Sequence, residues 1–149
     1  VTPADQIDHV VSVLAGSVNA TLVGALAAAG GRPVGLSLAD GDLTTAEAIS
    51  ESLGRVGRVT GGDPALVHAL WRAGFLPVVS SIGADAGGAP LNINADDAAG
   101  ALARVLGARA VVSLTAVPGL PDRSGTLIDS LKPGRARART ARRTPARAL

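Results

Sequence analysis

The polar residues with the clearest chemical potential lie in one short stretch, residues 91–97 (LNINADD). Asn92 and Asn94 are two apart, so in an extended segment their amides face one side and offer donors and acceptors to one pocket. Asp96 falls where a helix begins, and unpaired backbone N–H groups at a helix N-terminus attract anions. The stretch therefore predicts a site for a small, polar, anionic ligand. Asn and Asp are also preferred in turns and as helix N-caps, so a purely structural role is the alternative.

Two helices are predicted before this stretch and one within and after it. Thr2, followed by proline, is typical of an N-cap, and the apolar spacing after it predicts a long helix that ends at Gly30. Asp63, also followed by proline, predicts the start of a shorter helix. The third helix is predicted over residues 95–107, so it carries Asp96 in its first turn.

Short apolar runs bounded by turn-forming residues predict strands, at residues 33–37, 76–80, 91–94 and 110–114. Residues 85–88 (DAGG) predict a hairpin turn before the third of them. Residues 45–53 favour a helix, whereas residues 55–60 alternate like an exposed strand. Strands that alternate with helices of about a dozen residues indicate an α/β fold, a three-layer αβα sandwich with a mainly parallel sheet.

Polar residues gather where the predicted strands end. Ser80, Ser81 and Thr115 lie at or just beyond such ends, as does the asparagine stretch. In parallel α/β sheets, ligands bind at the carboxyl ends of the strands. We therefore expect these residues to lie near one another.

The composition suits one hydrophobic core built mainly from Val, Leu, Ile and Ala. Trp71 and Phe75, four apart on one helical face, are expected to belong to this core. The absence of cysteine excludes disulfides and thiolate metal sites, and the two histidines, His9 and His68, are too few for a metal cluster and are expected at the surface. No uninterrupted apolar run long enough to span a bilayer and no signal peptide are evident, so a soluble, cytoplasmic protein is expected.

The charge is divided between two parts of the chain. Residues 1–131 carry seven arginines and twelve acidic residues, a net charge of −5, whereas residues 132–149 carry Lys132 and six arginines, a net charge of +7. The basic tail lacks apolar periodicity and is expected to be disordered. Arginines without interleaved aromatic residues predict at most non-specific, salt-dependent binding to nucleic acid, so nucleic acid is not the expected partner.

Seven segments in order along the chain carry a family resemblance: VTPADQID, GSVNATLV, PVGLSLADGD, LGRVGRV, GFLPVVSSIG, LNINADDAAGALARVLGA and SLTAVPGL. With them the chain resembles the amino acid kinase family, and within it the acetylglutamate kinases, over residues 1–131. The resemblance implies ATP-dependent phosphorylation of the side-chain carboxylate of N-acetyl-L-glutamate, with Mg²⁺, in arginine biosynthesis. It also implies a homodimer formed through the N-terminal helix.

The resemblance implies roles for single residues. Asn92 and Asn94 match the motif that holds the acetylamino acid, with Ala95 and Ser80 beside them. Asp96 matches the aspartate that organises phosphate-clamping lysines, and is the implied catalytic residue. The adenine nucleotide is implied to border the segment 114–120, with these cofactor-binding residues: Leu114, Thr115, Val117, Gly119 and Leu120. No metal ligand is implied, and Ala116 stands where the family usually has aspartate.

The family pattern also includes a lysine, glycine-rich loops and an arginine before Val1, and a second lysine in a C-terminal portion. We therefore expect residues 1–131 to be an incomplete amino acid kinase-like domain, truncated at both ends, with impaired turnover. The reason is that phosphoryl transfer depends on cations that neutralise developing charge. The alternatives are a catalytically inactive small-molecule-binding or regulatory paralogue, and a nucleic-acid binder that uses the basic tail.

Overall fold

The computed structural model describes residues 1–114, 119, 122, 126–128 and 130. It divides into two units, Val1–Val111 and Val112–Leu149, and the elements below belong to the first. The helices are α1 (Ile7–Val11), η1 (Ser12–Val18), α2 (Asn19–Ala28), η2 (Asp40–Asp42), η3 (Glu51–Leu53), α3 (Ala65–Arg72) and α4 (Ala95–Val105). The strands are β1 (Pro33–Ser37), β2 (Thr45–Ala48), β3 (Val56–Gly61), β4 (Leu76–Ser80), β5 (Ile82–Ala84) and β6 (Pro90–Ile93). The predicted domain end at residue 131 and the predicted disorder of residues 132–149 lie outside the described residues.

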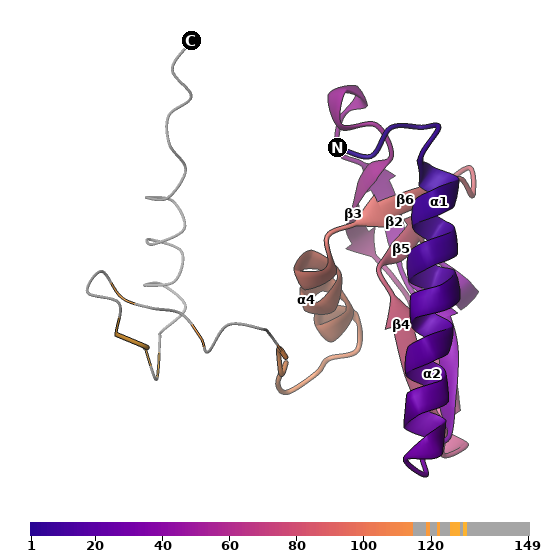
Figure 1. Cartoon of the computed structure of the whole chain (residues 1–149), viewed down its shortest axis with the longest axis vertical. Coiled ribbons are helices and arrows are strands. Elements are labelled where there is room, and N and C mark those ends of the chain that lie inside the picture. The colour runs from indigo at the N-terminus through magenta and orange to yellow at the C-terminus, as the bar shows by residue number, and fades with distance from the viewer. Residues whose placement is uncertain (115–118, 120–121, 123–125, 129, 131–149) are drawn as a thin grey trace. The chain divides into compact units, whose positions relative to one another are not determined.

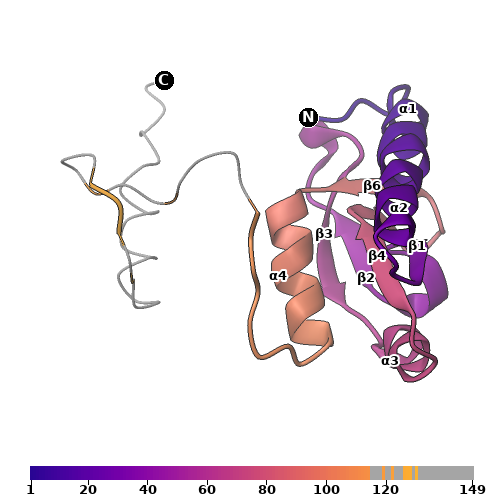
Figure 2. The same cartoon turned by 60° about the horizontal axis from the view of Figure 1, so that its bottom comes forward.

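The strands form two sheets, one of β1 and β4 and one in the order β2-β3-β6-β5 (Figure 2). Pairing is parallel between β1 and β4 and between β3 and β6. It is antiparallel between β2 and β3 and between β5 and β6. The long helix made of α1, η1 and α2 lies on one side of these strands and α4 on the other (Figure 1). The predicted α/β class, with helices on both sides of the strands, is therefore confirmed.

The chain enters the fold differently from the prediction at Thr2. Thr2 does not cap a helix: it forms an isolated parallel bridge with Gly54, and its N–H donates to the Leu53 carbonyl at 3.0 Å. This pairing holds the first residues extended, so the long helix begins only at Ile7. The helix ends as predicted, with Gly30 in the left-handed region at φ 88°.

Residues 45–48 form a strand rather than the predicted helix. Thr45 to Ala48 pair antiparallel with β3, and a register shift lies between Thr45 and Ala46. Ala46 is buried in the core, whereas Glu47 on the opposite face forms an exposed ion pair with Arg58 across the two strands. Pairing with β3 and burial of Ala46 thus override the local helical propensity.

The strand predicted at residues 110–114 is not formed in the described part of the chain. Val112 and Leu114 are 84% and 95% exposed, and no described residue pairs with this segment in a sheet. A buried parallel strand depends on hydrogen bonds to neighbours that are distant in the sequence. Apolar composition alone therefore does not fix this segment as a strand.

The core lies between β2, β6 and α4. Its buried cluster consists of Leu38, Ala46, Leu91, Ile93 and Ala98. The expectation that Trp71 belongs to the core is wrong, because its side chain is 48% exposed and lies beside the His68 ring, with centroids 5.6 Å apart. Phe75 is half-buried under the guanidinium of Arg32, 4.2 Å from the ring centroid.

The long helix corrects the expectation about membrane-spanning segments. Ile7–Ala28 is 22 residues long with a mean hydropathy of 1.8 in its most apolar window, enough by length and composition to cross a membrane. Length and composition are weak evidence, because a buried core helix of a soluble protein and a signal sequence near an N-terminus pass the same test. Asn19, in the middle of this helix, is buried and donates a hydrogen bond to the Val78 carbonyl of β4 at 2.9 Å. The helix is thus joined to the sheet through a polar contact.

Candidate functional site

The ends of β4 and β6 meet at the start of α4. The Ile93 N–H donates to the Ser81 carbonyl at 3.1 Å, and α4 begins two residues after Ile93. The Ser80–Ser81 strand end and the asparagine stretch therefore lie together, as their positions in the sequence predicted. Thr115, expected at the same edge, lies outside the described residues.

Asn94 is the N-cap of α4. Its Oδ1 accepts hydrogen bonds from the backbone N–H groups of Asp96 (3.0 Å) and Asp97 (3.2 Å). The structural alternative for this asparagine is thus confirmed. The two N–H groups that were expected to be free for an anion are occupied, and the Asp96 and Asp97 carboxylates add negative charge there. The α4 N-terminus is not an open anion site at these two groups.

We expect Asn94→Ala to lower the free energy of unfolding by about 0.5–2 kcal/mol, because α4 loses the acceptor for two N–H groups. Asn94→Ser keeps a capping oxygen and should lower the free energy of unfolding by only a few tenths of a kcal/mol. Urea unfolding followed by circular dichroism measures both. Equal stability of the alanine variant and the wild type would show that the cap contributes nothing.

The Asn92 amide points into a different set of contacts. Its Nδ2 donates to the Thr2 Oγ1 at 2.9 Å, and its backbone N–H donates to the Arg55 carbonyl at 2.8 Å. The side chain is half-buried, and its Oδ1 makes no hydrogen bond to another described residue. Asn92 and Asn94 therefore do not act as a matched pair. Asn94 caps α4, whereas Asn92 is held by Thr2 and keeps an Oδ1 that bonds to no other described residue.

Asp96 and Asp97 are exposed in the first turn of α4, where negative charge suits the helix dipole. In the described part of the chain, no three His, Cys, Asp or Glu side chains are grouped so that they could hold a metal ion. A Mg²⁺ ion that arrives with a nucleotide needs only one or two protein carboxylates, since phosphates and water supply its other ligands.

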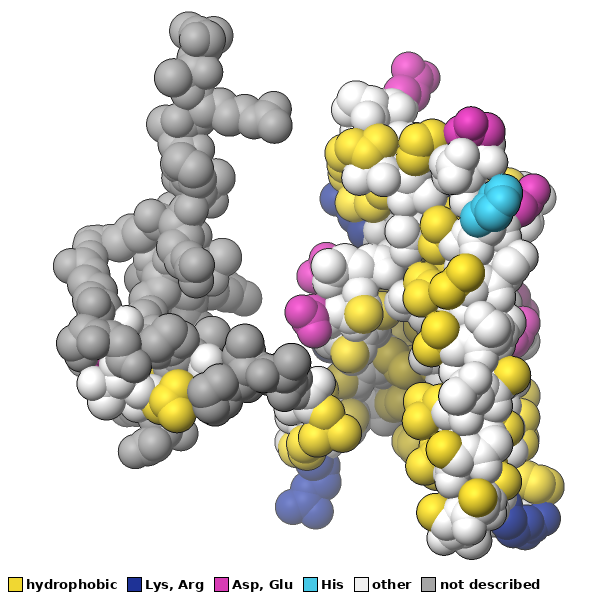
Figure 3. Space-filling model, in the orientation of Figure 1, with side chains coloured by type: hydrophobic (Ala, Val, Ile, Leu, Met, Phe, Trp, Pro, Cys, Tyr) yellow, Lys and Arg dark blue, Asp and Glu magenta, His cyan; other side chains and the backbone are white. Residues whose placement is uncertain are grey.

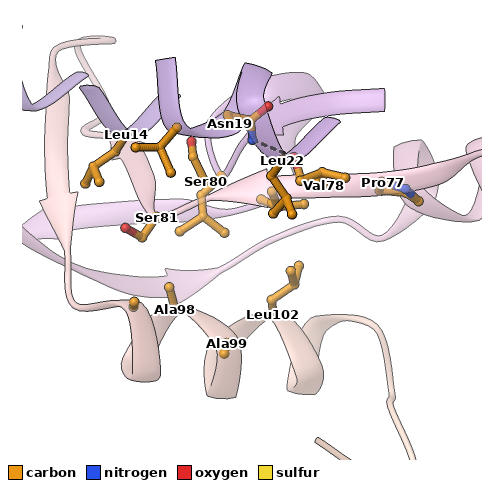
Figure 4. Close-up of a pocket in the computed structure, with 14 residues that line it drawn as sticks. Leu14, Asn19, Leu22, Pro77, Val78, Ser80, Ser81, Ala98, Ala99 and Leu102 are labelled. Carbon is orange, nitrogen blue, oxygen red and sulfur yellow. Dashed lines mark hydrogen bonds between the residues drawn. The ribbon is translucent and has the colours of Figure 1, made fainter. Parts of the chain in front are cut away.

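Ser80 and Ala95 line a pocket of about 380 Å³ between the long helix and α4. Figure 4 shows Leu14 and Leu22 on one wall and Ala98, Ala99 and Leu102 on the opposite wall. Ser80 is only 9% exposed, and its hydroxyl has no hydrogen-bond partner among the described residues. The walls are mostly apolar, and the polar residues that line the pocket are Asn19, Ser80 and Ser81.

Asn19 lines the pocket and links the long helix to the sheet, a structural role that the sequence did not predict. Its Nδ2 donates to the carbonyls of Val78 (2.9 Å) and Leu36 (3.4 Å), so it joins the long helix to both strands of the β1–β4 sheet. Gly35 leaves room for it, because a Cβ at Gly35 would collide with the Asn19 Oδ1. The available signal was the only asparagine in the predicted helix, set among apolar and small residues.

Arg55 ties the β5–β6 hairpin to β3. Its Nε donates to the Pro90 carbonyl and its Nη2 to Asp85, both at 2.9 Å. The Asp85 Oδ1 accepts from the N–H groups of Gly87 and Ala89 within the turn. The hydrogen bond from Arg55, followed by that from the Ala89 N–H, holds the pKa of Asp85 below its ordinary value of 3.8. The predicted turn at residues 85–88 is thus confirmed, together with an ion pair that the sequence did not reveal.

Asp85→Asn should destabilise the protein at neutral pH but not in acid. A carboxyl whose folded pKa is depressed stabilises the fold above its unfolded pKa, and this contribution disappears as the pH falls through the folded value. The stability difference between wild type and Asp85→Asn should therefore shrink below pH 3.8. The Oδ1 of asparagine can still accept the turn hydrogen bonds, so the substitution removes the ion pair with Arg55, together with its hydrogen bond, and leaves the turn contacts in place.

Chemical unfolding at a series of pH values measures this difference. Glu47→Gln is the matched control, because the Glu47–Arg58 pair is well exposed and such pairs contribute little. A difference for Asp85→Asn that stays constant down to pH 2 would contradict the assignment.

The residues expected to border a nucleotide belong to the second unit, from residue 112 on. Leu114 is almost fully exposed, and Gly119 is exposed with φ 143°. Thr115, Val117 and Leu120 lie outside the described residues. Their expected role in binding a nucleotide stays a prediction.

Comparison with known proteins gives a consistent result. The model of the amino acid kinase family matches residues 1–142, past the boundary expected at residue 131. An acetylglutamate kinase from Pectobacterium atrosepticum is 51% identical over 128 residues, which cover 86% of this chain and 49% of that protein. An acetylglutamate kinase from Proteus mirabilis is 44% identical over 138 residues, 93% of this chain and 53% of that one.

A solved structure, smu.665 from Streptococcus mutans UA159, matches with a TM-score of 0.82 at 26% sequence identity. The match covers 95% of this chain and 58% of that one. The chain thus spans about half the length of the curated relatives it matches.

Proposed function

The chain belongs to the amino acid kinase family, and we propose that it carries the acceptor half of an acetylglutamate kinase site. The acceptor is N-acetyl-L-glutamate, whose side-chain carboxylate would receive the γ-phosphoryl group of ATP in arginine biosynthesis. The similarity to two named acetylglutamate kinases supports this substrate. The observation that carries the proposal is the Asn92 amide, fixed between Thr2 and Arg55 beside the start of α4.

In this proposal Asn92 binds the acetylamino acid. Ser80 and Ala95, which line the pocket, and Asn94, which caps α4, are the other proposed binding residues. A primary amide can donate to a carboxylate oxygen and accept from an N–H group, and N-acetyl-L-glutamate offers both. The amide is held before the ligand arrives, which lowers the entropic cost of aligning an acceptor. Phosphoryl transfer depends mainly on such alignment and on neutralising charge, so no nucleophilic side chain is needed.

Asp96 is the proposed catalytic residue at the start of α4. Its exposed carboxylate is available to organise cations around the transferring phosphoryl group. Mg²⁺ is proposed to arrive with ATP and to neutralise charge on its phosphates, with no protein ligand assigned to it. Leu114, Thr115, Val117, Gly119 and Leu120 are proposed to border the nucleotide.

The proposal includes a cytoplasmic homodimer formed through the long helix. Val13, which does not line the pocket, is 51% exposed on it, and hydrophobic side chains follow its length in Figure 3. Apolar side chains exposed along one element favour burial against a partner. Sedimentation equilibrium at micromolar concentrations tests this, and a monomer at every concentration would contradict it.

Calorimetric titration of the purified chain with N-acetyl-L-glutamate, with and without MgATP, tests the substrate. A coupled assay for ADP release, dependent on N-acetyl-L-glutamate, tests turnover. Binding with a preference over L-glutamate supports the proposal. If the folded chain binds neither N-acetyl-L-glutamate nor L-glutamate, with or without MgATP, the proposed substrate site is overturned for these 149 residues.

The second candidate is a binding or regulatory protein without turnover. Lys132 is the only lysine in the 149 residues, and lysine is one of the two side chains with which phosphoryl transferases neutralise charge in the transition state. Binding of N-acetyl-L-glutamate without release of ADP, in the presence of MgATP, would select this candidate.

A further inference from the structure

Thr2 is fixed in the fold by its backbone on both sides. Its N–H donates to the Leu53 carbonyl at 3.0 Å, and its carbonyl accepts from the Arg55 N–H at 2.7 Å. The residue is only 4% exposed. These contacts allow Thr2 little freedom to shift, so its side chain has a defined position relative to the turn at residues 53–55.

Gly54 makes this arrangement possible. It has φ 65° and ψ −128°, a conformation that side chains with a Cβ rarely adopt. A Cβ at this position would also collide with the Thr2 carbonyl. The turn is thus shaped so that Thr2 can pair closely with it.

The Thr2 hydroxyl faces the proposed ligand-binding amide. Thr2 Oγ1 accepts the hydrogen bond from the Asn92 Nδ2 at 2.9 Å. The same turn fixes the Asn92 backbone, since the Asn92 N–H donates to the Arg55 carbonyl. With its backbone N–H and one side-chain N–H both bonded, the amide is held with its Nδ2 toward Thr2.

We propose that Thr2 is a positioning residue for Asn92: its hydroxyl sets the orientation of the amide that binds N-acetyl-L-glutamate. This rests on the proposed function, because it assigns Thr2 a role at the same site. Thr2 does not touch the ligand and acts only through Asn92. A hydroxyl is required, whereas the shape of the side chain alone is not sufficient.

Thr2→Val tests the proposal, because valine keeps the shape and removes the hydroxyl. Thr2→Ser is the matched control that keeps the hydroxyl. The first readout is the side-chain NH₂ signal of Asn92 in a ¹⁵N spectrum of the full chain, assigned by its loss in Asn92→Ala. The second is the affinity for N-acetyl-L-glutamate by calorimetry.

We expect the Asn92 signal to shift in Thr2→Val and the affinity to fall about fivefold to tenfold, the effect of one hydrogen bond. Thr2→Ser should stay within about twofold of the wild type because it restores that hydrogen bond. Equal affinities of the wild type and Thr2→Val, or equal losses in both variants, would overturn the role of the hydroxyl. A folded wild type that does not bind the ligand would instead overturn the proposed function, and the ligand-orienting role of Thr2 with it.

Discussion

Asn92→Ala is expected to bind N-acetyl-L-glutamate about tenfold to a hundredfold more weakly than the wild type, because a hydrogen bond to a charged group contributes about 1.5–3 kcal/mol. The effect on folding should be small. Asn92 is half-buried, and the Thr2 hydroxyl that loses its partner can bond to water in the space that the amide leaves. Calorimetric titration gives the affinity, and thermal unfolding shows whether the variant is folded.

Asn92→Asp sharpens this test, because aspartate has nearly the same shape and replaces the N–H donors with negative charge. It should bind the dianionic ligand more weakly still than Asn92→Ala, since like charges repel. His68→Ala, on the exposed face of α3, is the control and should bind like the wild type. Wild-type affinity in both Asn92 variants would remove Asn92 from the site.

Asn94 is a less useful probe of ligand binding than its sequence position suggests. Its loss removes the cap of α4, so weaker binding in Asn94→Ala would mix two causes. The period-two spacing predicted that both amides face one pocket, but spacing cannot show which partner each amide finds: Asn94 caps α4, and Asn92 bonds to Thr2. The pattern of Asn94 followed by two acidic residues and a helix was already typical of an N-cap.

The contact that distinguishes Asn92 could not be predicted from local sequence. Thr2 and Asn92 are ninety positions apart, and the local pattern at Thr2 favoured a helix N-cap. The long-range bridge to Gly54 decided the outcome instead. Arg55 and Asp85 form a similar case, since nothing in their local patterns indicates that they pair.

The elements predicted correctly are those whose signals are local. β1, β4 and β6 are short apolar runs between breakers, and the turn at residues 85–88 carries its own hydrogen-bonding aspartate. Two segments were assigned wrongly for the same reason. A helix was predicted where β2 forms, and a strand was predicted at residues 110–114, where the structure has none. A strand exists where a neighbour pairs with it: β2 has β3, and residues 110–114 have no such neighbour among the described residues.

Leu91→Ala should have the largest effect on stability, lowering the free energy of unfolding by about 2–5 kcal/mol. Leu91 is 0% exposed and belongs to the cluster that joins β6 to α4. Packing there is tight: a Cβ at Gly57, on the neighbouring strand, would lie 2.8 Å from the Leu91 Cβ. Because neighbouring groups relax only partly around a lost side chain, much of the space would remain as a cavity.

Leu76→Ala is the matched control, since Leu76 is 44% exposed at the start of β4, and should cost less than about 1 kcal/mol. Urea unfolding at one pH compares the two variants. Equal losses would mean that the cluster around Leu91 is not the main apolar core. A loss of several kcal/mol would be a large part of the stability of a small domain, about 5–15 kcal/mol. Since Leu91 directly precedes Asn92 in β6, the position of the proposed ligand-binding amide would then depend on this core as well as on Thr2.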